Sequence, residues 1–246
     1  MKLVRSSLVA ALCAAMIALP ASPALAKAPR LGKGGASTNW CGYAALTSLT
    51  APDEGSVSDV KGTWTVPSVT GSSNAYSSAW VGIDGYDSKT VEQIGTESDW
   101  VGGGARYYAW WEMFPKMSRL IPNVTVQPRD QISAEVRWLN KRVFQLSMVN
   151  VTTGETFSTL QRRGNADQSS AEWIVEAPSL GGTLPLAQFT PTTFTDCEAT
   201  INGHTGGIND SHWVDDGIDL VNFSGTVIAS PSSLTAGGTS FTVTRD

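Results

Sequence analysis

The chain is a succession of short segments in which apolar and polar residues alternate, separated by residues that favour turns. Such segments cover residues 57–66, 79–83, 90–94, 107–114, 131–138, 143–151, 171–176, 186–189, 218–223, 226–228 and 241–244. Residues 150–155 have the composition of a hairpin turn. The sequence shows no sustained helical period and no internal repeat. Many short strands at this spacing predict an all-β sandwich or barrel.

The first 26 residues are typical of a secretory signal peptide. Lys2 and Arg5 give a positive start, residues 8–19 are apolar, and residues 24–26 (Ala-Leu-Ala) form a small-residue cleavage signal. A membrane anchor is the alternative, but this apolar stretch is short for a bilayer span. We therefore expect secretion, with no membrane attachment after cleavage.

We expect a basic, Gly-rich flexible arm or short pro-segment over residues 27–38 and a single domain over residues 39–246, acting as a monomer. Loss of Lys2 and Arg5 from the 17 basic residues leaves 15 against 22 acidic ones, a net charge of −7. The sequence has no basic stripe for nucleic acid. Charged residues make up only 16% of the chain, against about 25% on average. Because few carboxylates are available to lose native partners on protonation, this composition suits an acidic environment.

Several of these segments place acids or amides among tryptophans. Strand alternation puts side chains two residues apart on one face. We expect one face to carry the following residues together: Trp80, Asp84, Gln93, Glu112 and Glu176. Carboxyl groups surrounded by aromatic rings have raised pKa values, which is a property of acid–base sites.

The order of these motifs resembles the glutamic peptidases (eqolisins). The resemblance runs from about Asn39 to about Cys197, and its motifs are residues 78–85 (SAWVGIDG), 91–95 (VEQIG), 99–100 (DW), 110–115 (WWEMFP) and 171–176 (AEWIVE). It implies a lectin-like sandwich of two antiparallel sheets, bent so that one face forms a concave cleft. It also implies cleavage of peptide bonds in protein or peptide substrates at acidic pH, without a metal or other cofactor.

The resemblance also implies a role for each matching residue. Gln93 matches the catalytic glutamine, and Glu176 matches the catalytic glutamate. Residues that match positions lining or supporting the cleft are Trp40, Trp80, Asp84, Asp99 and Glu112, and we add Trp110 and Glu172, the first acid of the second strand motif.

The chemistry expected of Gln93 and Glu176 follows from their functional groups. Glu176 as a carboxylate would take a proton from water and later pass it to the leaving nitrogen. The Gln93 amide would donate a hydrogen bond to the oxygen on which negative charge develops. Asp84, Asp99 and Glu112 would orient this pair.

Other catalytic classes lack their signatures. His204 and His212 do not have the spacing of a His-Glu-x-x-His metal site, and there is no Gly-x-Ser-x-Gly elbow or pepsin-type aspartate pair. A carbohydrate-active or carbohydrate-binding lectin-like sandwich is the alternative. However, Glu172 and Glu176 lie about 13 Å apart in a regular strand, whereas glycosidase carboxyls are about 5–9.5 Å apart. Only a bulge would bring them together.

Two cysteines remain after signal removal, Cys41 and Cys197. In a secreted protein we expect them to form a disulfide. Two inert buried thiols are the alternative. A nucleophilic role for Cys41 is not expected, because no histidine lies near it in the sequence.

Overall fold

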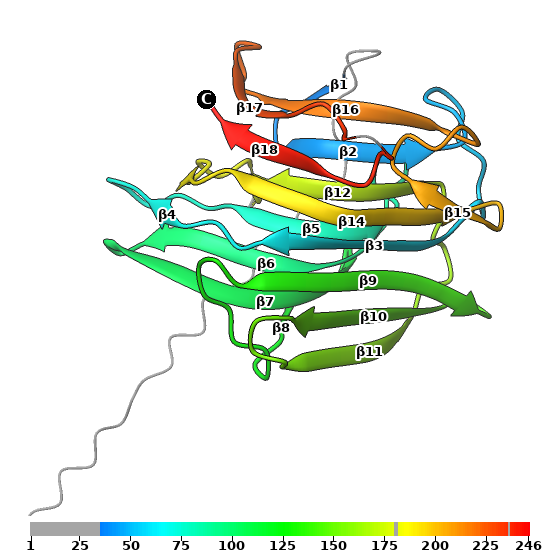
Figure 1. The fold of residues 1–246 in the computed structure, drawn as a ribbon, viewed down its shortest axis with the longest axis horizontal. Coiled ribbons are helices and arrows are strands. Elements are labelled where there is room, and N and C mark those ends of the chain that lie inside the picture. Colours follow the sequence, from blue (N-terminus) through cyan, green and yellow to red (C-terminus); the bar gives the residue numbers. More distant parts are fainter. Residues whose placement is uncertain (1–34, 180–181, 236) are drawn as a thin grey trace, which may run out of the picture.

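The computed structural model describes residues 35–179, 182–235 and 237–246, and every regular element within them is a β-strand (Figure 1). The strands are β1 (Gly35–Ser37), β2 (Trp40–Leu46), β3 (Val57–Thr65), β4 (Val69–Thr70), β5 (Ser78–Ile83), β6 (Val91–Val101), β7 (Gly104–Phe114), β8 (Arg119–Leu120), β9 (Gln131–Asn140), β10 (Val143–Asn150), β11 (Thr156–Arg162), β12 (Ser170–Glu176), β13 (Gln188–Phe189), β14 (Thr192–Ile201), β15 (His204–Gly207), β16 (Val214–Val221), β17 (Val227–Pro231) and β18 (Phe241–Arg245). The all-β prediction is confirmed. In the described part of the chain no helix is long and apolar enough to cross a bilayer.

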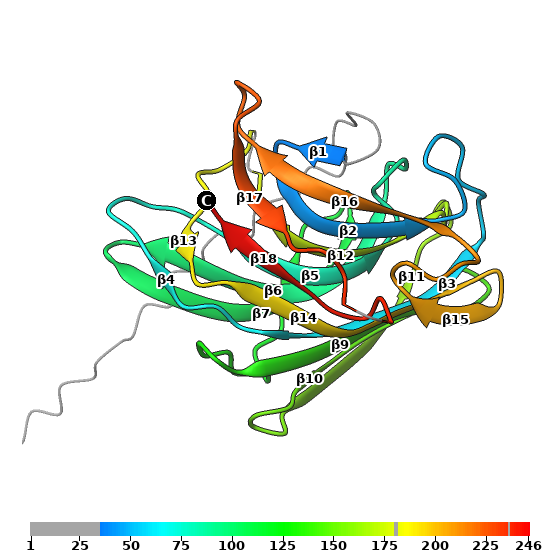
Figure 2. The ribbon, with the colours of Figure 1, turned by 45° about the horizontal axis from the view of Figure 1, so that its top comes forward.

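One hydrogen-bonded ladder runs through most of the molecule and folds back on itself. Its order is β11-β10-β9-β3-β14-β18-β17-β16-β2-β12-β5-β6-β7-β8, with β1 parallel to β16 and β15 antiparallel to β14. Strands β3 and β9 pack against β5, and β12 packs against β3 and β14. The ladder therefore forms the two layers of a sandwich, joined through β18, β17 and β16 (Figures 1 and 2).

Alternation along the strands divides the core from the opposite face of the β2-β12-β5-β6-β7 layer. On β12, Trp173 and Val175 belong to the core between the layers, whereas Glu172, Ile174 and Glu176 point to the other face. Burial of a large apolar side chain contributes about 1.5–3 kcal/mol. Because a one-residue slip would exchange the two sets, the core residues fix the orientation of the acids.

Strand β14 was not among the expected segments, and a bulge explains why. Its buried residues are Thr192 and Phe194 and then Cys197, Ala199 and Ile201, so the alternation changes phase. The pairing with β3 shifts at this point, where Asp196 has a φ of 52°. An extra residue in one strand produces this change of phase, and a search for strict alternation therefore misses the strand.

The predicted flexible arm is only partly within the described residues. The signal peptide and residues 27–34 lie outside them. Gly35–Ser37, however, form the buried strand β1, and the Ser37 hydroxyl accepts hydrogen bonds from the backbone N–H groups of Asn39 and Trp40. This end of the predicted arm is therefore part of the folded domain.

The predicted disulfide is absent from the structure. Cys41 on β2 and Cys197 on β14 are both free and buried. Three strands, β18, β17 and β16, lie between β14 and β2 in the ladder. The disulfide was expected from secretion and from the even number of cysteines, and neither feature reports where the two cysteines lie in the fold. Burial raises the pKa of both thiols, which agrees with the alternative of two inert buried cysteines.

Candidate active site

The candidate site lies on the face of the β2-β12-β5-β6-β7 layer that points away from the core. We call it the acid-lined face, defined by Trp80, Gln93, Glu112, Glu172 and Glu176. The strand register places Glu172, Gly82, Gln93 and Glu112 in one row across β12, β5, β6 and β7, and Glu176, Ser78 and Glu97 in another. Trp80, Gly95 and Trp110 form the row between them.

Gly82 creates the space in which Trp80 and Gln93 meet. A Cβ atom at this position would lie 2.9 Å from the Trp80 ring and 3.1 Å from the Gln93 Cβ. The first distance is shorter than real Cβ contacts, so a larger residue would displace the indole. A glycine inside a strand is typical of such close approaches.

Gln93 is held by Glu112, its neighbour on the next strand. The Gln93 Nε2 atom donates a hydrogen bond of 2.6 Å to Glu112 Oε2, and both side chains are buried. An amide nitrogen has two N–H donors, so one remains for another acceptor. Gln93 Oε1 and Glu112 Oε1 have no hydrogen-bond partner among the described residues. This pair thus offers both a donor and acceptors to a ligand.

Glu176 receives one donor on each carboxyl oxygen. Asn39 Nδ2 donates to Oε1 at 3.1 Å, and the Trp80 indole Nε1 donates to Oε2 at 2.9 Å. The Trp40 ring packs edge-on against Trp80, with centroids 5.1 Å apart. Burial raises the pKa of Glu176 to about 8, and the hydrogen bonds from Trp80 and Asn39 act in the opposite direction. The carboxyl is therefore fixed in orientation and tends to keep its proton.

Glu112 is perturbed in the same direction. Burial raises its pKa to about 8, the negative charge of Glu176 adds to the shift, and the hydrogen bond from Gln93 opposes it. An interaction of this kind between two carboxyls requires proximity. Glu112 and Glu176 are therefore close enough to interact, although they come from β7 and β12.

A protein-family model identifies which of the two expected classes, glutamic peptidase or carbohydrate-active sandwich, this chain belongs to. The model described as the Peptidase A4 family matches residues 38–245. The chain belongs to this family. The expected relationship to the glutamic peptidases is thus confirmed.

Two curated relatives and two solved structures agree with this assignment. The chain is 33% identical to scytalidopepsin B of Scytalidium lignicola over 62% of its own length and 62% of the relative's, and 31% identical to aspergillopepsin-2 of Aspergillus niger over 73% and 70%. Scytalido-glutamic peptidase with a transition-state analogue inhibitor matches with a TM-score of 0.72 and 26% identity, covering 85% of this chain and 98% of that one. Aspergilloglutamic peptidase from Aspergillus niger matches with a TM-score of 0.60 and 31% identity, covering 70% and 99%.

Asp84, which was expected on this face of the Peptidase A4 chain, lies just beyond the end of β5 and is close enough to Glu172 to raise the pKa of that acid. It follows the end of β5 with a φ of 74°, and its carboxylate accepts hydrogen bonds from the backbone N–H groups of Gln168 and Ser169, each at 2.9 Å. It also acts electrostatically on Glu92, which points from β6 toward the core. The positive φ ends the alternation, and Asp84 fixes the turn to the loop before β12.

Glu172 and Trp110 lie on the acid-lined face as expected. Burial raises the pKa of Glu172, and the charges of Asp84 and Glu92 act in the same direction. Strand β12 pairs without a register shift with both β2 and β5. No bulge therefore shortens the distance between Glu172 and Glu176 along this strand.

Two further side chains of this face were missed in the sequence. Asn39 holds Glu176, and Glu97 lies beside Glu176 across Ser78. Burial raises the pKa of Glu97, and the charge of Asp99 adds to this effect. Burial raises the pKa of Asp99 to about 6, opposed by hydrogen bonds that include the Ser77 N–H. If the strand that contains Gln93 is continued beyond residue 94, alternation places Glu97 on the same face as Gln93.

Proposed function

We propose that this chain is a secreted acid endopeptidase that hydrolyses peptide bonds with Gln93 and Glu176. It would act on protein or peptide substrates as a monomer. The observation that carries the proposal is the pairing of an oriented amide with an oriented carboxyl. Gln93 is fixed by Glu112, Glu176 is fixed by Asn39 and Trp80, and both groups belong to one face.

The Gln93 amide would stabilise the oxyanion. One of its N–H groups donates to Glu112 at 2.6 Å, which leaves the second for the carbonyl oxygen of the scissile bond. That oxygen gains negative charge when water attacks the carbonyl carbon. A donor held in place before the reaction contributes about 2.7–4 kcal/mol to such a step. Since an amide does not ionise, the donor is available at every pH.

Glu176 would transfer the proton. Its carboxylate takes a proton from water as the water oxygen bonds to the carbonyl carbon. The protonated acid then gives that proton to the leaving nitrogen as the C–N bond breaks. Burial is the main cause of its high pKa. A water bound to the carboxyl restores part of the lost hydration, and this favours the carboxylate in the substrate complex.

The neighbouring acids account for an acidic working range. At acidic pH both Glu112 and Glu176 are mostly neutral, because burial raises the pKa of each to about 8, and the base is supplied by the minor form in which Glu176 alone is ionised. As the pH approaches 8, Glu112 ionises as well. Two like charges on a buried face then repel each other and repel the oxyanion. Turnover should therefore decline on the alkaline side as Glu112 loses its proton.

Three variants test the proposal. Glu176→Gln removes the base and Gln93→Glu replaces the neutral donor with an acid, while both keep the size of the side chain. Each should lower peptide turnover at pH 4 by at least about 10²–10³-fold. Glu172→Gln is the matched control, because it changes a buried acid on the same strand and face, and it should lose far less.

The same variants separate peptidase from carbohydrate chemistry. In a glycosidase Glu172 and Glu176 would be equally necessary and Gln93 dispensable, with activity on a β-glucan rather than on casein. Circular dichroism should show that all three variants fold. A folded Gln93→Glu protein with near wild-type peptide turnover would overturn the proposed role of Gln93.

A further inference from the structure

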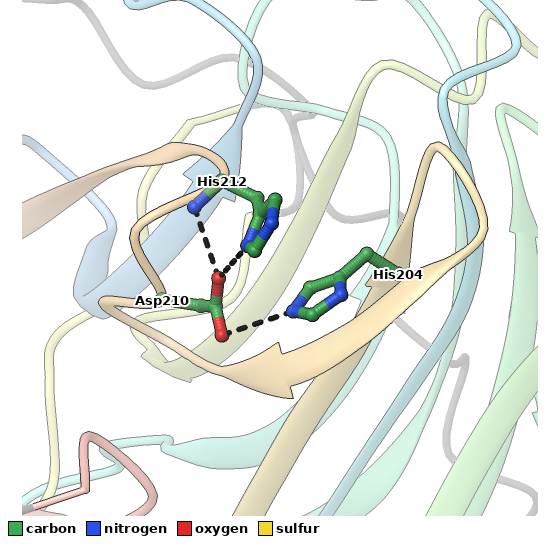
Figure 3. A group of neighbouring side chains, drawn as sticks. All are labelled: His204, Asp210 and His212. Atoms are coloured by element: carbon green, nitrogen blue, oxygen red, sulfur yellow. Dashed lines mark hydrogen bonds and ion pairs between the residues drawn. The ribbon is translucent and has the colours of Figure 1, made fainter.

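A second group of chemically active side chains lies on a hairpin, away from the acid-lined face. His204 begins β15, and Asp210 and His212 follow in the loop between β15 and β16 (Figure 3). We call these three residues the hairpin cluster. One ligand atom from each can be chosen so that all lie within 4.8 Å of one another. Strand β15 pairs with β14, which belongs to the layer opposite β12, β5 and β6.

The Asp210 carboxylate is at the centre of the hairpin cluster. Its Oδ2 lies 3.2 Å from His204 Nε2, and its Oδ1 lies 2.7 Å from His212 Nδ1. The His212 backbone N–H also donates to Oδ1, at 2.9 Å. Figure 3 shows that both rings direct a nitrogen toward this carboxylate. Two imidazole nitrogens and a carboxylate oxygen thus converge from a segment of nine residues.

The backbone of the loop holds this arrangement. The Asp210 N–H donates to the Gly207 carbonyl oxygen, and the Trp213 N–H donates to the Asp210 carbonyl oxygen. The buried Trp213 indole is anchored by the Ile208 carbonyl oxygen at 2.9 Å. A Cβ atom at Gly206 would lie only 2.3 Å from Asp210 Oδ2. Only a glycine at position 206 leaves room for the carboxylate in this position.

The imidazole rings of His204 and His212 lie close together. Their centroids are 3.8 Å apart with an angle of 31° between the planes. Two imidazolium cations at this separation would repel each other. Two neutral imidazoles that share one cation avoid this repulsion. The side chains of His204 and His212 are 42% and 59% exposed, so an ion and its remaining water ligands have access.

We propose that the hairpin cluster binds one divalent transition-metal ion of the Zn²⁺ or Cu²⁺ class through His204 Nε2, His212 Nδ1 and a carboxylate oxygen of Asp210. Imidazole nitrogen and carboxylate oxygen are ordinary ligands of these ions, and water completes the coordination. On binding, the proton now between each ring nitrogen and Asp210 moves to the other ring nitrogen or to solvent. The ion would tie the loop before β16 to β15.

Calorimetric titration with Zn²⁺ at pH 7.5 tests this site, because neutral imidazoles are required as ligands. The full chain carrying Glu176→Gln avoids self-digestion and leaves the hairpin cluster intact. We expect one equivalent bound, and at least about tenfold weaker binding for His204→Gln, His212→Gln and Asp210→Asn. Asp53→Asn, on a different exposed loop, is the matched control and should bind like the parent.

Cu²⁺ binding followed by electron paramagnetic resonance gives an independent readout. The parent should show hyperfine coupling to two imidazole nitrogens, and each histidine variant to one. This measurement identifies the ligands even if Asp210→Asn alters the loop. The proposal is wrong if the parent binds no stoichiometric ion, or if the histidine variants bind with the affinity and spectrum of the parent.

Discussion

Replacing Glu112 with glutamine should make the free energy of unfolding less sensitive to pH. Burial and the charge of Glu176 raise the pKa of Glu112 to about 8, from an ordinary value of 4.5. Between these values the unfolded chain releases the proton while the native protein keeps it. The native state therefore binds more protons, and its stability falls as the pH rises. The stability is fully present below pH 4.5 and is lost progressively toward pH 8.

The size of the effect follows from the two pKa values of Glu112. Each pH unit between them changes the free energy of unfolding by about 1.4 kcal/mol. Between pH 4.5 and pH 7 the wild-type protein should lose about 3 kcal/mol through Glu112 alone. Glutamine has no proton to release and can still accept the hydrogen bond from Gln93. The Glu112→Gln variant should therefore lose about 3 kcal/mol less than wild type over this range.

Urea unfolding monitored by tryptophan fluorescence measures this difference at pH 4.5, 5.5, 6.5 and 7. Mass spectrometry after each series would exclude self-digestion. Glu54→Gln, which removes a carboxyl from an exposed loop, is the control and should follow the wild-type dependence. The reasoning is refuted if wild-type stability is constant or rises from pH 4.5 to 7, or if Glu112→Gln loses as much stability as wild type.

Other predictions concern the support of the site and the thiols. Trp80→Phe removes the indole donor to Glu176; it should raise the pKa of that carboxyl and shift the pH profile of turnover to higher pH, whereas an unchanged profile would contradict the bond. Gly82→Ala should lower the melting temperature, because its Cβ would lie 2.9 Å from the Trp80 ring. A thermal unfolding curve that matches wild type would show that the Trp80 ring can move aside without cost. Thiol titration should find Cys41 and Cys197 unreactive in the native protein and both reactive after unfolding without reductant, and a single reactive thiol or none would indicate oxidation. EDTA should leave peptide turnover unchanged, because the proposed reaction uses no metal.

The fold was predictable where strands alternate without interruption. β5, β9 and β12 agree with the expected segments within two residues, because each has an apolar set that faces the core. Strand β14 was not predictable in this way, since its bulge at Asp196 changes the phase of alternation. Strand β6 extends to Val101 rather than ending at Ile94. Its polar residues 96–99 are buried against neighbouring strands, a tertiary effect that composition does not reveal.

The site was predictable where its members share a strand register. Gln93 and Glu112 were expected on one face, and the register places them directly opposite each other. Asp84 follows β5 with a positive φ, so strict alternation does not fix the direction of its side chain. The hairpin cluster could not be found from spacing, because His204, Asp210 and His212 meet only when the chain reverses after β15.

The acid-lined face connects the proposed activity with stability through a single physical cause. Burial raises the pKa of both Glu112 and Glu176 to about 8. At acidic pH these groups are neutral, so the face can remain closed to solvent without a charge-desolvation penalty. At neutral pH the same burial opposes ionisation and favours the unfolded chain. A variant that ionises these acids more easily, for example by opening the face to water, should therefore gain stability at neutral pH. If the variant ionises Glu112 in particular, turnover in acid should also fall, because a second carboxylate beside Gln93 would repel the oxyanion that this amide stabilises.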